Sequence, residues 1–275
     1  MKSQFSHPLI ILLALVGHAT ATPLQPVVLA SRGQPSVEAG SKAKAVPVTL
    51  KQPLSAGSVL TTGPQERLAV AIAPGQLVSL DANSKLKVEA VHLAEPGHGA
   101  IIKLLQGIVR CSVNPELGHS APVFTLIVKK ESIQAQGTLW QTGIVEGTEA
   151  PISKTSTVVV NSTITVNIEL SKNADKLSLQ VSANSVLTSV YEAEVWQESK
   201  IVNLVTKLLT RYVRTGPNTY AVTTYPASET ELGQALAALQ TAIGQMGEVA
   251  SNTLLTPPLS SSSTGNDTTV SPEQP

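Results

Sequence analysis

The sequence predicts a mainly β protein, either a sandwich of short strands or a β-helix-like coil of strands, followed by two C-terminal helices. Between residues 37 and 190, short runs rich in β-branched residues are separated by Gly, Pro and Asn. Turns such as Ala56-Gly57 and Pro74-Gly75 recur at the spacing of a strand plus a turn. No helix-length periodic segment lies between these runs, which excludes a parallel α/β architecture because its crossovers need one.

The first 21 residues are expected to be an export signal. Lys2 precedes an apolar run at 9–16, and Ala19-Thr20-Ala21 fits the small-x-small rule for cleavage before Thr22. The alternative is a membrane anchor, but the apolar run is shorter than the roughly 20 residues that span a bilayer. We therefore expect a mature chain without stable membrane insertion, located in the periplasm or secreted.

The β region is expected to be one unit covering residues 37–190, after a leading segment at 22–36 in which 27–30 form a short strand. Apolar and β-branched residues alternate with polar ones in most of its runs, as in strands with one buried face. The predicted strands are 45–50, 58–61, 67–72, 77–80, 85–91, 100–105, 107–113, 123–129, 132–136, 138–144, 157–160, 163–170 and 177–181.

Residues 191–255 are expected to be helical. In 198–213 the apolar residues follow helical spacing, which predicts a helix that packs on the β region through Ile201, Val205, Leu208 and Tyr212. A second helix is predicted to begin at Ser228 and to reach residue 249, because Ser228 and Glu231 form a capping-box pattern. Residues 219–225 form a short extended segment between the two helices.

The last segment, 256–275, is rich in Ser, Thr and Pro and is expected to be disordered. Together these boundaries divide the chain into a signal peptide at 1–21, a leading segment at 22–36, the β domain at 37–190, a helical region at 191–255 and a tail at 256–275.

Composition excludes several functions. The 275 residues carry 19 basic and 19 acidic side chains, and aromatic residues make up 3% of the chain, so neither the charge nor the stacking surface of a nucleic-acid-binding protein is present. Five histidines and three aspartates leave little material for hydrolytic sites. No serine lies in a G-x-S-x-G elbow, and no phosphate-binding glycine motif occurs. We expect no enzyme activity, no catalytic or cofactor-binding residues and no cofactor.

Three features of the sequence could form sites, and we expect a structural role for each. Val109, Cys111 and Val113 alternate on one face, which predicts a buried, inert thiol; an intermolecular disulfide is the alternative. His92 and His98 flank a polar turn whose Pro-Gly pair would misalign metal ligands, so no metal site is predicted. Glycines 57, 63, 75 and 107, Thr138 beside a turn and Trp140 over the core are expected to be structural, with a functional surface at Trp140 as the alternative.

The order of motifs in the β region resembles the FecR-type extracytoplasmic domain. The resemblance covers about residues 57–140, with a continuation to 190. It depends on the order and spacing of the following segments: LSAGSVLTTG at 54–63, LAVAI at 68–72, PGQLVSL at 74–80, NSKLKV at 83–88, IKLLQGIV at 102–109, VFTL at 123–126 and AQGTLW at 135–140.

FecR regulators also carry a cytoplasmic segment that handles a sigma factor and one membrane span before the periplasmic domain, which senses an outer-membrane receptor. This sequence does not display those two parts, and it has Leu-Trp-Gln-Thr at 139–142 where the family has an aromatic residue and a Val. The resemblance therefore implies an exported module without the anti-sigma role.

Two functions remain open. The first is a non-enzymatic module for protein binding or envelope sensing, in which strand edges or loops receive a protein partner or a second copy of the chain. The second is a structural component of the cell envelope or an extracellular matrix. If the leader is retained, a signal-anchored FecR-type regulator is a further alternative.

Overall fold

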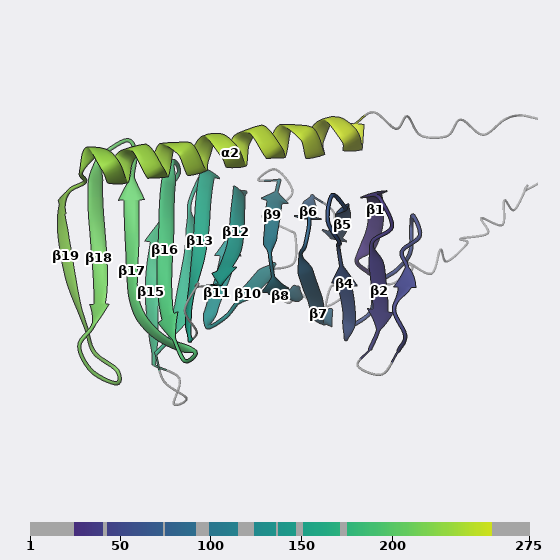
Figure 1. Cartoon of the computed structure of the whole chain (residues 1–275), viewed down its shortest axis with the longest axis horizontal. Coiled ribbons are helices and arrows are strands. Elements are labelled where there is room, and N and C mark those ends of the chain that lie inside the picture. The colour runs from purple at the N-terminus through teal and green to yellow at the C-terminus, as the bar shows by residue number, and fades with distance from the viewer. Residues whose placement is uncertain are drawn as a thin grey trace, which may run out of the picture.

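The chain folds into two stacked β-sheets and one long helix (Figure 1). The computed structural model describes residues 25–40, 43–73, 75–91, 99–114, 124–135, 137–146, 151–170 and 175–254, apart from the side chains of residues 146 and 247–254. The predicted leader, the tail at 256–275 and the histidines 92, 98 and 119 lie outside these residues. The mainly β prediction is confirmed, and the two sheets correspond to the sandwich alternative.

The larger sheet has ten strands in the order β1-β5-β6-β9-β12-β13-β16-β17-β18-β19, and the smaller has nine in the order β15-β14-β11-β10-β8-β7-β4-β2-β3. All neighbours are antiparallel except β8 and β10. The strands of the larger sheet are β1 Val27–Arg32, β5 Arg67–Ala73, β6 Gln76–Leu80, β9 Ile108–Val113, β12 Leu139–Glu146, β13 Ile152–Asn161, β16 Ser185–Glu192, β17 Val195–Asn203, β18 Leu208–Arg214 and β19 Tyr220–Pro226. Those of the smaller sheet are β2 Ser36–Ala39, β3 Val46–Pro47, β4 Ser58–Thr61, β7 Lys85–Val91, β8 Ala100–Gln106, β10 Thr125–Val128, β11 Glu131–Ala135, β14 Ile164–Glu169 and β15 Lys176–Val181.

The main core lies between the two sheets. In β14, Ile164, Val166 and Ile168 are fully buried while the residues between them are half-buried, as expected for a strand with one face in the core. Trp140 is also fully buried, with its ring centroid 5.9 Å from that of Phe124. Cys111 lies in the same core as a free thiol, and burial raises its pKa well above the ordinary value. Both residues are therefore buried in the core, as the sequence predicts.

A carboxylate is buried in this core as well. Glu131 accepts hydrogen bonds through Oε1 from Thr155 Oγ1 at 2.7 Å and from the Tyr191 hydroxyl at 2.9 Å. Its exposed fraction is 1%, and burial raises its pKa above the ordinary value despite the bonds that Thr155, Ser189 and Tyr191 contribute. The folded protein thus retains the Glu131 proton to a higher pH than the unfolded chain does.

Glu131→Gln is expected to remove a pH-dependent component of stability. In the wild type, the contribution of Glu131 is fully present below its unfolded pKa of about 4.3 and is lost as pH rises through the raised folded-state pKa. The difference in unfolding free energy between wild type and Glu131→Gln should therefore fall with rising pH and then level off. Denaturant titrations between pH 4 and 8 measure it, and other titrating groups cancel in the difference. A difference that is constant with pH would contradict the assignment.

The helix, α2 Glu229–Leu254, crosses the outer face of the larger sheet at one end of its strands (Figure 1). Ser228 and Glu231 form the predicted capping box: the Ser228 backbone N–H donates to Glu231 Oε2 at 2.9 Å, and the Glu231 N–H donates to Ser228 Oγ at 3.3 Å. The buried face of the helix and the strands beneath it form a second apolar cluster. Its fully described members are Val158, Val186, Val202, Leu209, Ala235, Leu239, Ala242 and Met246.

The predicted helix over 198–213 is wrong. Residues of this segment form β17 and β18, which pair antiparallel with Val202 opposite Leu209, and only α2 of the two expected C-terminal helices is present among the described residues. The error has a physical cause. Val202 and Leu209 contact α2 on one side of the sheet, while Ile201 and Tyr212 pack against the main core on the other. Strands with two apolar faces do not alternate, and their pattern mimics a helical stripe.

Val205, predicted to pack on the β region, is therefore expected to tolerate a charge. Val205 lies in the turn between β17 and β18 with 70% of its surface exposed, so Val205→Asp should change the unfolding free energy by less than about 0.5 kcal/mol. Leu209→Asp should instead cost about 3 kcal/mol or more, because it buries a carboxylate beneath α2. Thermal unfolding of both variants measures the contrast, and equal melting temperatures would contradict the strand assignment.

Candidate protein-binding site

The larger sheet extends beyond the smaller one at the C-terminal end of the sandwich. The smaller sheet ends at β15, whereas the larger continues past β16 through β17, β18 and β19 (Figure 1). The inner face of β18 and β19, which looks toward the smaller sheet, is therefore uncovered by a second layer among the described strands. All residues of β19 are exposed. We call β18 and β19 together the overhang.

An aromatic cluster lies on the inner face of the overhang. The Tyr220 ring is 6.5 Å from that of Trp196 in an edge-to-face arrangement, and 6.3 Å from that of Tyr212. Trp196 is almost fully buried and donates its indole N–H to Ser199 Oγ at 2.8 Å, whereas 41% of Tyr220 is exposed. Burial, with a smaller effect of Tyr220, raises the pKa of the Tyr212 hydroxyl. The cluster is thus anchored in the core and ends in an exposed, neutral aromatic surface.

The edge of β19 that is turned away from β18 presents backbone groups to solvent. The Ala227 N–H donates to Lys207 C=O at 2.9 Å, and the Thr215 N–H donates to Thr219 C=O at 3.0 Å. Together with the β18–β19 register, these bonds direct the N–H and C=O groups of the odd-numbered residues toward β18. Those of Tyr220, Val222 and Thr224 consequently point away from β18. We call this side the free edge of β19.

The other three sheet edges are shorter, covered or charged. β1 has a bulge and ends in Arg32, and the segment after β3 covers it: the Val28 N–H donates to Gln52 C=O at 3.0 Å and the Lys51 N–H donates to Val28 C=O at 2.8 Å. β3 has two residues, one of them a proline, and β15 begins with Lys176. These are the devices by which proteins protect edges from pairing. β19, with seven residues and no charge, has none of them apart from its terminal proline.

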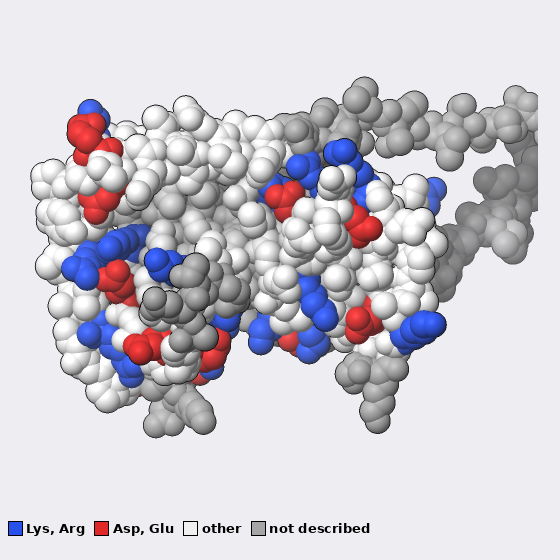
Figure 2. Space-filling model, viewed as in Figure 1, with Lys and Arg blue, Asp and Glu red and all other residues white. Residues whose placement is uncertain are grey.

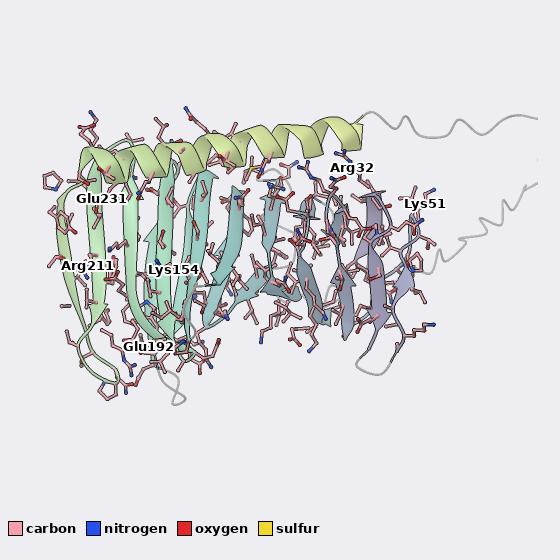
Figure 3. All side chains as sticks on the ribbon, viewed as in Figure 1. Arg32, Lys51, Lys154, Glu192, Arg211 and Glu231 are labelled. Atoms are coloured by element: carbon pink, nitrogen blue, oxygen red, sulfur yellow. The ribbon has the colours of Figure 1, made fainter. Side chains whose placement is uncertain are left out.

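Charge distribution separates the two ends of the sandwich. The rim formed by β19 is uncharged in Figure 2, and the nearest charged groups lie on the neighbouring strand and at the start of α2. At the opposite end, Arg32 and Lys51 project from the rim (Figure 3). Arg211, on the outer face of β18, donates from Nη2 to Glu198 Oε2 at 2.6 Å, and the pKa of Glu198 is lowered, because the effects of Arg211 and Lys200 outweigh desolvation. The free edge thus has no local charge to repel another strand.

The expectation that the chain has no catalytic or metal-binding residues stays a prediction. Among the residues that the structure describes, no cluster of His, Cys, Asp and Glu could hold a metal ion. No described helix combines the length and apolarity needed to cross a membrane. The sequence does not predict the free edge, because the spacing of apolar residues in 198–213 predicts a helix where β18 lies. Its signal was the uncharged run at 219–225, which was expected to be extended and forms most of β19.

Comparison with known proteins places part of the chain in a family. Residues 58–165 match the FecR protein family. No curated protein matches the chain. Two crystal structures of a proposed anti-sigma factor from Parabacteroides distasonis ATCC 8503 share 12% identity with it, at TM-scores of 0.38 and 0.39. The alignments cover 68% of this chain and 92% and 91% of the other. The overhang and α2 lie outside residues 58–165, which match the FecR family. The resemblance read from the sequence is confirmed, and the chain carries a FecR domain at residues 58–165.

Proposed function

We propose that the protein is a non-enzymatic, exported module that binds a protein partner in envelope sensing or regulation, and that the partner adds a strand to the free edge of β19. The FecR domain supports a regulatory or sensing role. The export pattern at residues 1–21 supports a location in the periplasm or outside the cell.

The observation that carries the proposal is the long, uncharged free edge beside an exposed aromatic surface. Backbone groups of Tyr220, Val222 and Thr224 supply the hydrogen bonds of an added strand, and the partly exposed Tyr220 ring and Val222 supply apolar contacts on the inner face. In this mode of recognition, an extended segment of the partner binds through its backbone hydrogen bonds and through every second side chain of the segment.

Thr224→Pro tests the proposal with little effect on the fold. The Thr224 N–H points to the free edge, so proline removes a donor for the added strand without removing a bond to β18. Thr224→Ala is the matched control, because it also loses the contact between the Thr224 and Thr210 hydroxyls, 3.1 Å apart, but keeps the N–H. Wild type and Thr224→Ala should recover the same stoichiometric partner from envelope extracts, and Thr224→Pro should lose it.

Equal recovery by both variants would place the partner elsewhere and contradict the proposal. Recovery of the wild type in a large insoluble assembly would instead favour the structural role in the envelope or matrix.

A further inference from the structure

We propose that the occupant of the free edge is a second copy of this chain, paired antiparallel through β19 about a two-fold axis at Val222. The proposal builds on the function proposed above and names the partner of the same edge. The backbone N–H and C=O groups of the even-numbered residues point to the free edge, so the register must oppose even-numbered residues to one another. A centre at Val222 is the one that pairs Tyr220, Val222 and Thr224 only among themselves, whereas a centre at 223 would oppose Tyr220 to Pro226. The centre at Val222 opposes Val222 to itself and Tyr220 to Thr224 of the second copy.

This register satisfies all the outward backbone groups of these three residues. Each opposed pair exchanges two hydrogen bonds, so the N–H and C=O groups of Tyr220, Val222 and Thr224 are all paired. Pro226, which has no N–H, falls at the end of the junction rather than within it. The two larger sheets then form one continuous sheet across the axis.

The side chains favour the same arrangement. Tyr220, Val222 and Thr224 lie on the inner face, since they pair with Arg214, Tyr212 and Thr210, and Tyr212 contacts the buried core. The two-fold axis brings the exposed parts of Tyr220 and Val222 from both copies together. In the monomer, 41% of Tyr220 and 49% of Val222 are exposed. Pairing therefore buries part of the apolar surface that these side chains expose.

The absence of charge along β19 favours a second copy as the occupant, because neither of the two opposed strands then carries a charge. The antiparallel register places the turn at 215–219 of the second copy beside the segment that joins β19 to α2. Arg214, just before that turn, is opposite Tyr220 and lies on the inner face, whereas α2, whose first turn carries Glu229 and Glu231, lies on the outer face. Glu231 is labelled at the start of the helix in Figure 3. The charged groups near the ends of the junction therefore lie on opposite faces of the sheet, and the strands between them carry no charge.

Sedimentation velocity over a series of protein concentrations tests the pairing. Wild type and Thr224→Ala should form dimers that dissociate on dilution, and Thr224→Pro should stay monomeric at the highest concentration. A wild type that is monomeric throughout would overturn the proposal, as would a dimer that withstands Thr224→Pro.

Cysteine cross-linking tests the register independently. Residues opposed in a hydrogen-bonded pair have Cα atoms about 5.5 Å apart, within disulfide range, so Val222→Cys should form an intermolecular disulfide under mild oxidation. Thr223 is on the same strand, but it lies on the outer face and opposite Ala221 of the second copy. Thr223→Cys should therefore form at least about tenfold less intermolecular disulfide than Val222→Cys. The native Cys111 is buried and does not compete. Equal cross-linking of both variants would overturn the proposed axis.

The two proposals fail differently. A monomeric wild type whose envelope partner is lost with Thr224→Pro overturns the second copy and leaves the proposed function standing. Envelope capture and self-association that are both unchanged by Thr224→Pro overturn both.

Discussion

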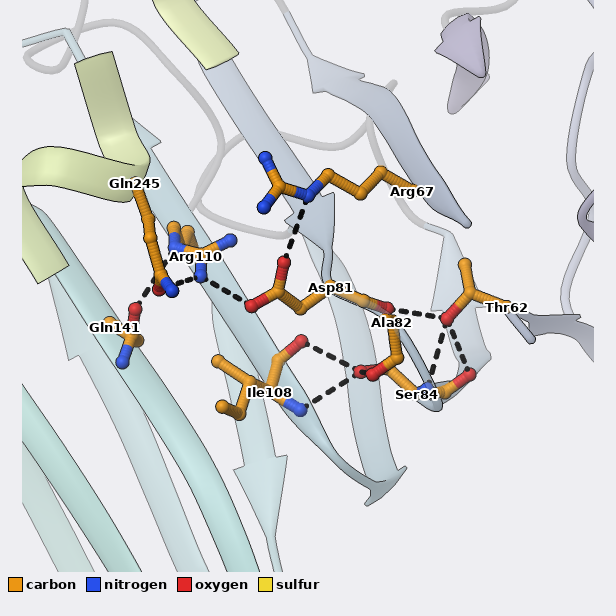
Figure 4. A network of polar contacts seen from close by, with 9 residues as sticks. All are labelled: Thr62, Arg67, Asp81, Ala82, Ser84, Ile108, Arg110, Gln141 and Gln245. Atoms are coloured by element: carbon orange, nitrogen blue, oxygen red, sulfur yellow. Dashed lines mark hydrogen bonds and ion pairs between the residues drawn. The ribbon is translucent and has the colours of Figure 1, made fainter. Parts of the chain in front are cut away.

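Asp81→Ala is expected to lower the unfolding free energy by about 3–5 kcal/mol, because it leaves a buried guanidinium without its counter-charge. Arg110 donates from Nη2 to Asp81 Oδ2 at 2.5 Å, and 3% of its side chain is exposed (Figure 4). Its remaining partners are amides: Arg110 Nε donates to Gln141 Oε1 at 2.9 Å, and Nη2 also donates to Gln245 of α2. Neither can replace a carboxylate. Chemical denaturation measures the loss.

Two further variants separate charge from packing. Glu198→Ala removes the partner of Arg211, whose side chain is 42% exposed, and should cost less than about 1 kcal/mol. Adding Arg110→Met to Asp81→Ala should restore much of the stability, since an apolar residue of similar length needs no counter-charge. A loss in Asp81→Ala no greater than that in Glu198→Ala would refute the role of this ion pair.

Gly107→Ala is expected to cost about 2–4 kcal/mol. Gly107 has a φ of +80°, and a Cβ there would lie 2.3 Å from Ser84 Oγ and 2.7 Å from the Asn83 carbonyl oxygen. Ser84 cannot simply move aside, because its hydroxyl accepts from the Ile108 N–H at 3.0 Å and lies 3.1 Å from the Ile108 carbonyl, to which it donates (Figure 4). These bonds connect the turn before β7 with the start of β9.

Gly40→Ala is the matched control for this substitution. Gly40 has a φ of +91°, but no atom lies within 4 Å of its Cβ position. It should cost about 1–2 kcal/mol from backbone strain alone. Thermal unfolding of the two variants therefore isolates the steric part, and equal losses would show that the contact with Ser84 and Asn83 is unimportant.

The β region could be predicted because most of its strands bury one face. The runs at 58–61 and 85–91 coincide with β4 and β7, and glycines 57, 75 and 107 have the positive φ expected of turns. Gly63 is predicted to be structural on the same grounds, but it has no positive φ. Helix α2 could be predicted because its capping box is local, with both partners three residues apart.

The site could not be predicted in the same way, because its determinants are distant in the sequence. The aromatic cluster joins Tyr220 to Trp196, which precedes it by 24 positions, on another strand. Whether β19 has a neighbour depends on where the sheet ends, and no local pattern encodes that. The strands β17 and β18 could not be predicted either. Apolar residues lie on both of their faces because α2 covers the outer one, so the alternation that identifies a strand is missing.

The order in which the chain visits the two sheets has a mechanical consequence. From β5 to β15 the chain places one or two strands in one sheet and then one or two in the other, so the sandwich lengthens steadily with sequence from β1 to β19 (Figure 1). Such a body behaves like a linear array, in which each section is stabilised mainly by its neighbours and the ends can fray separately. Helix α2 runs back along this axis from β19 to Arg110 in β9. It therefore connects the last strands to the middle of the sandwich. Force applied at the β19 end is then shared by the strands beneath the helix, and the strands do not detach one at a time.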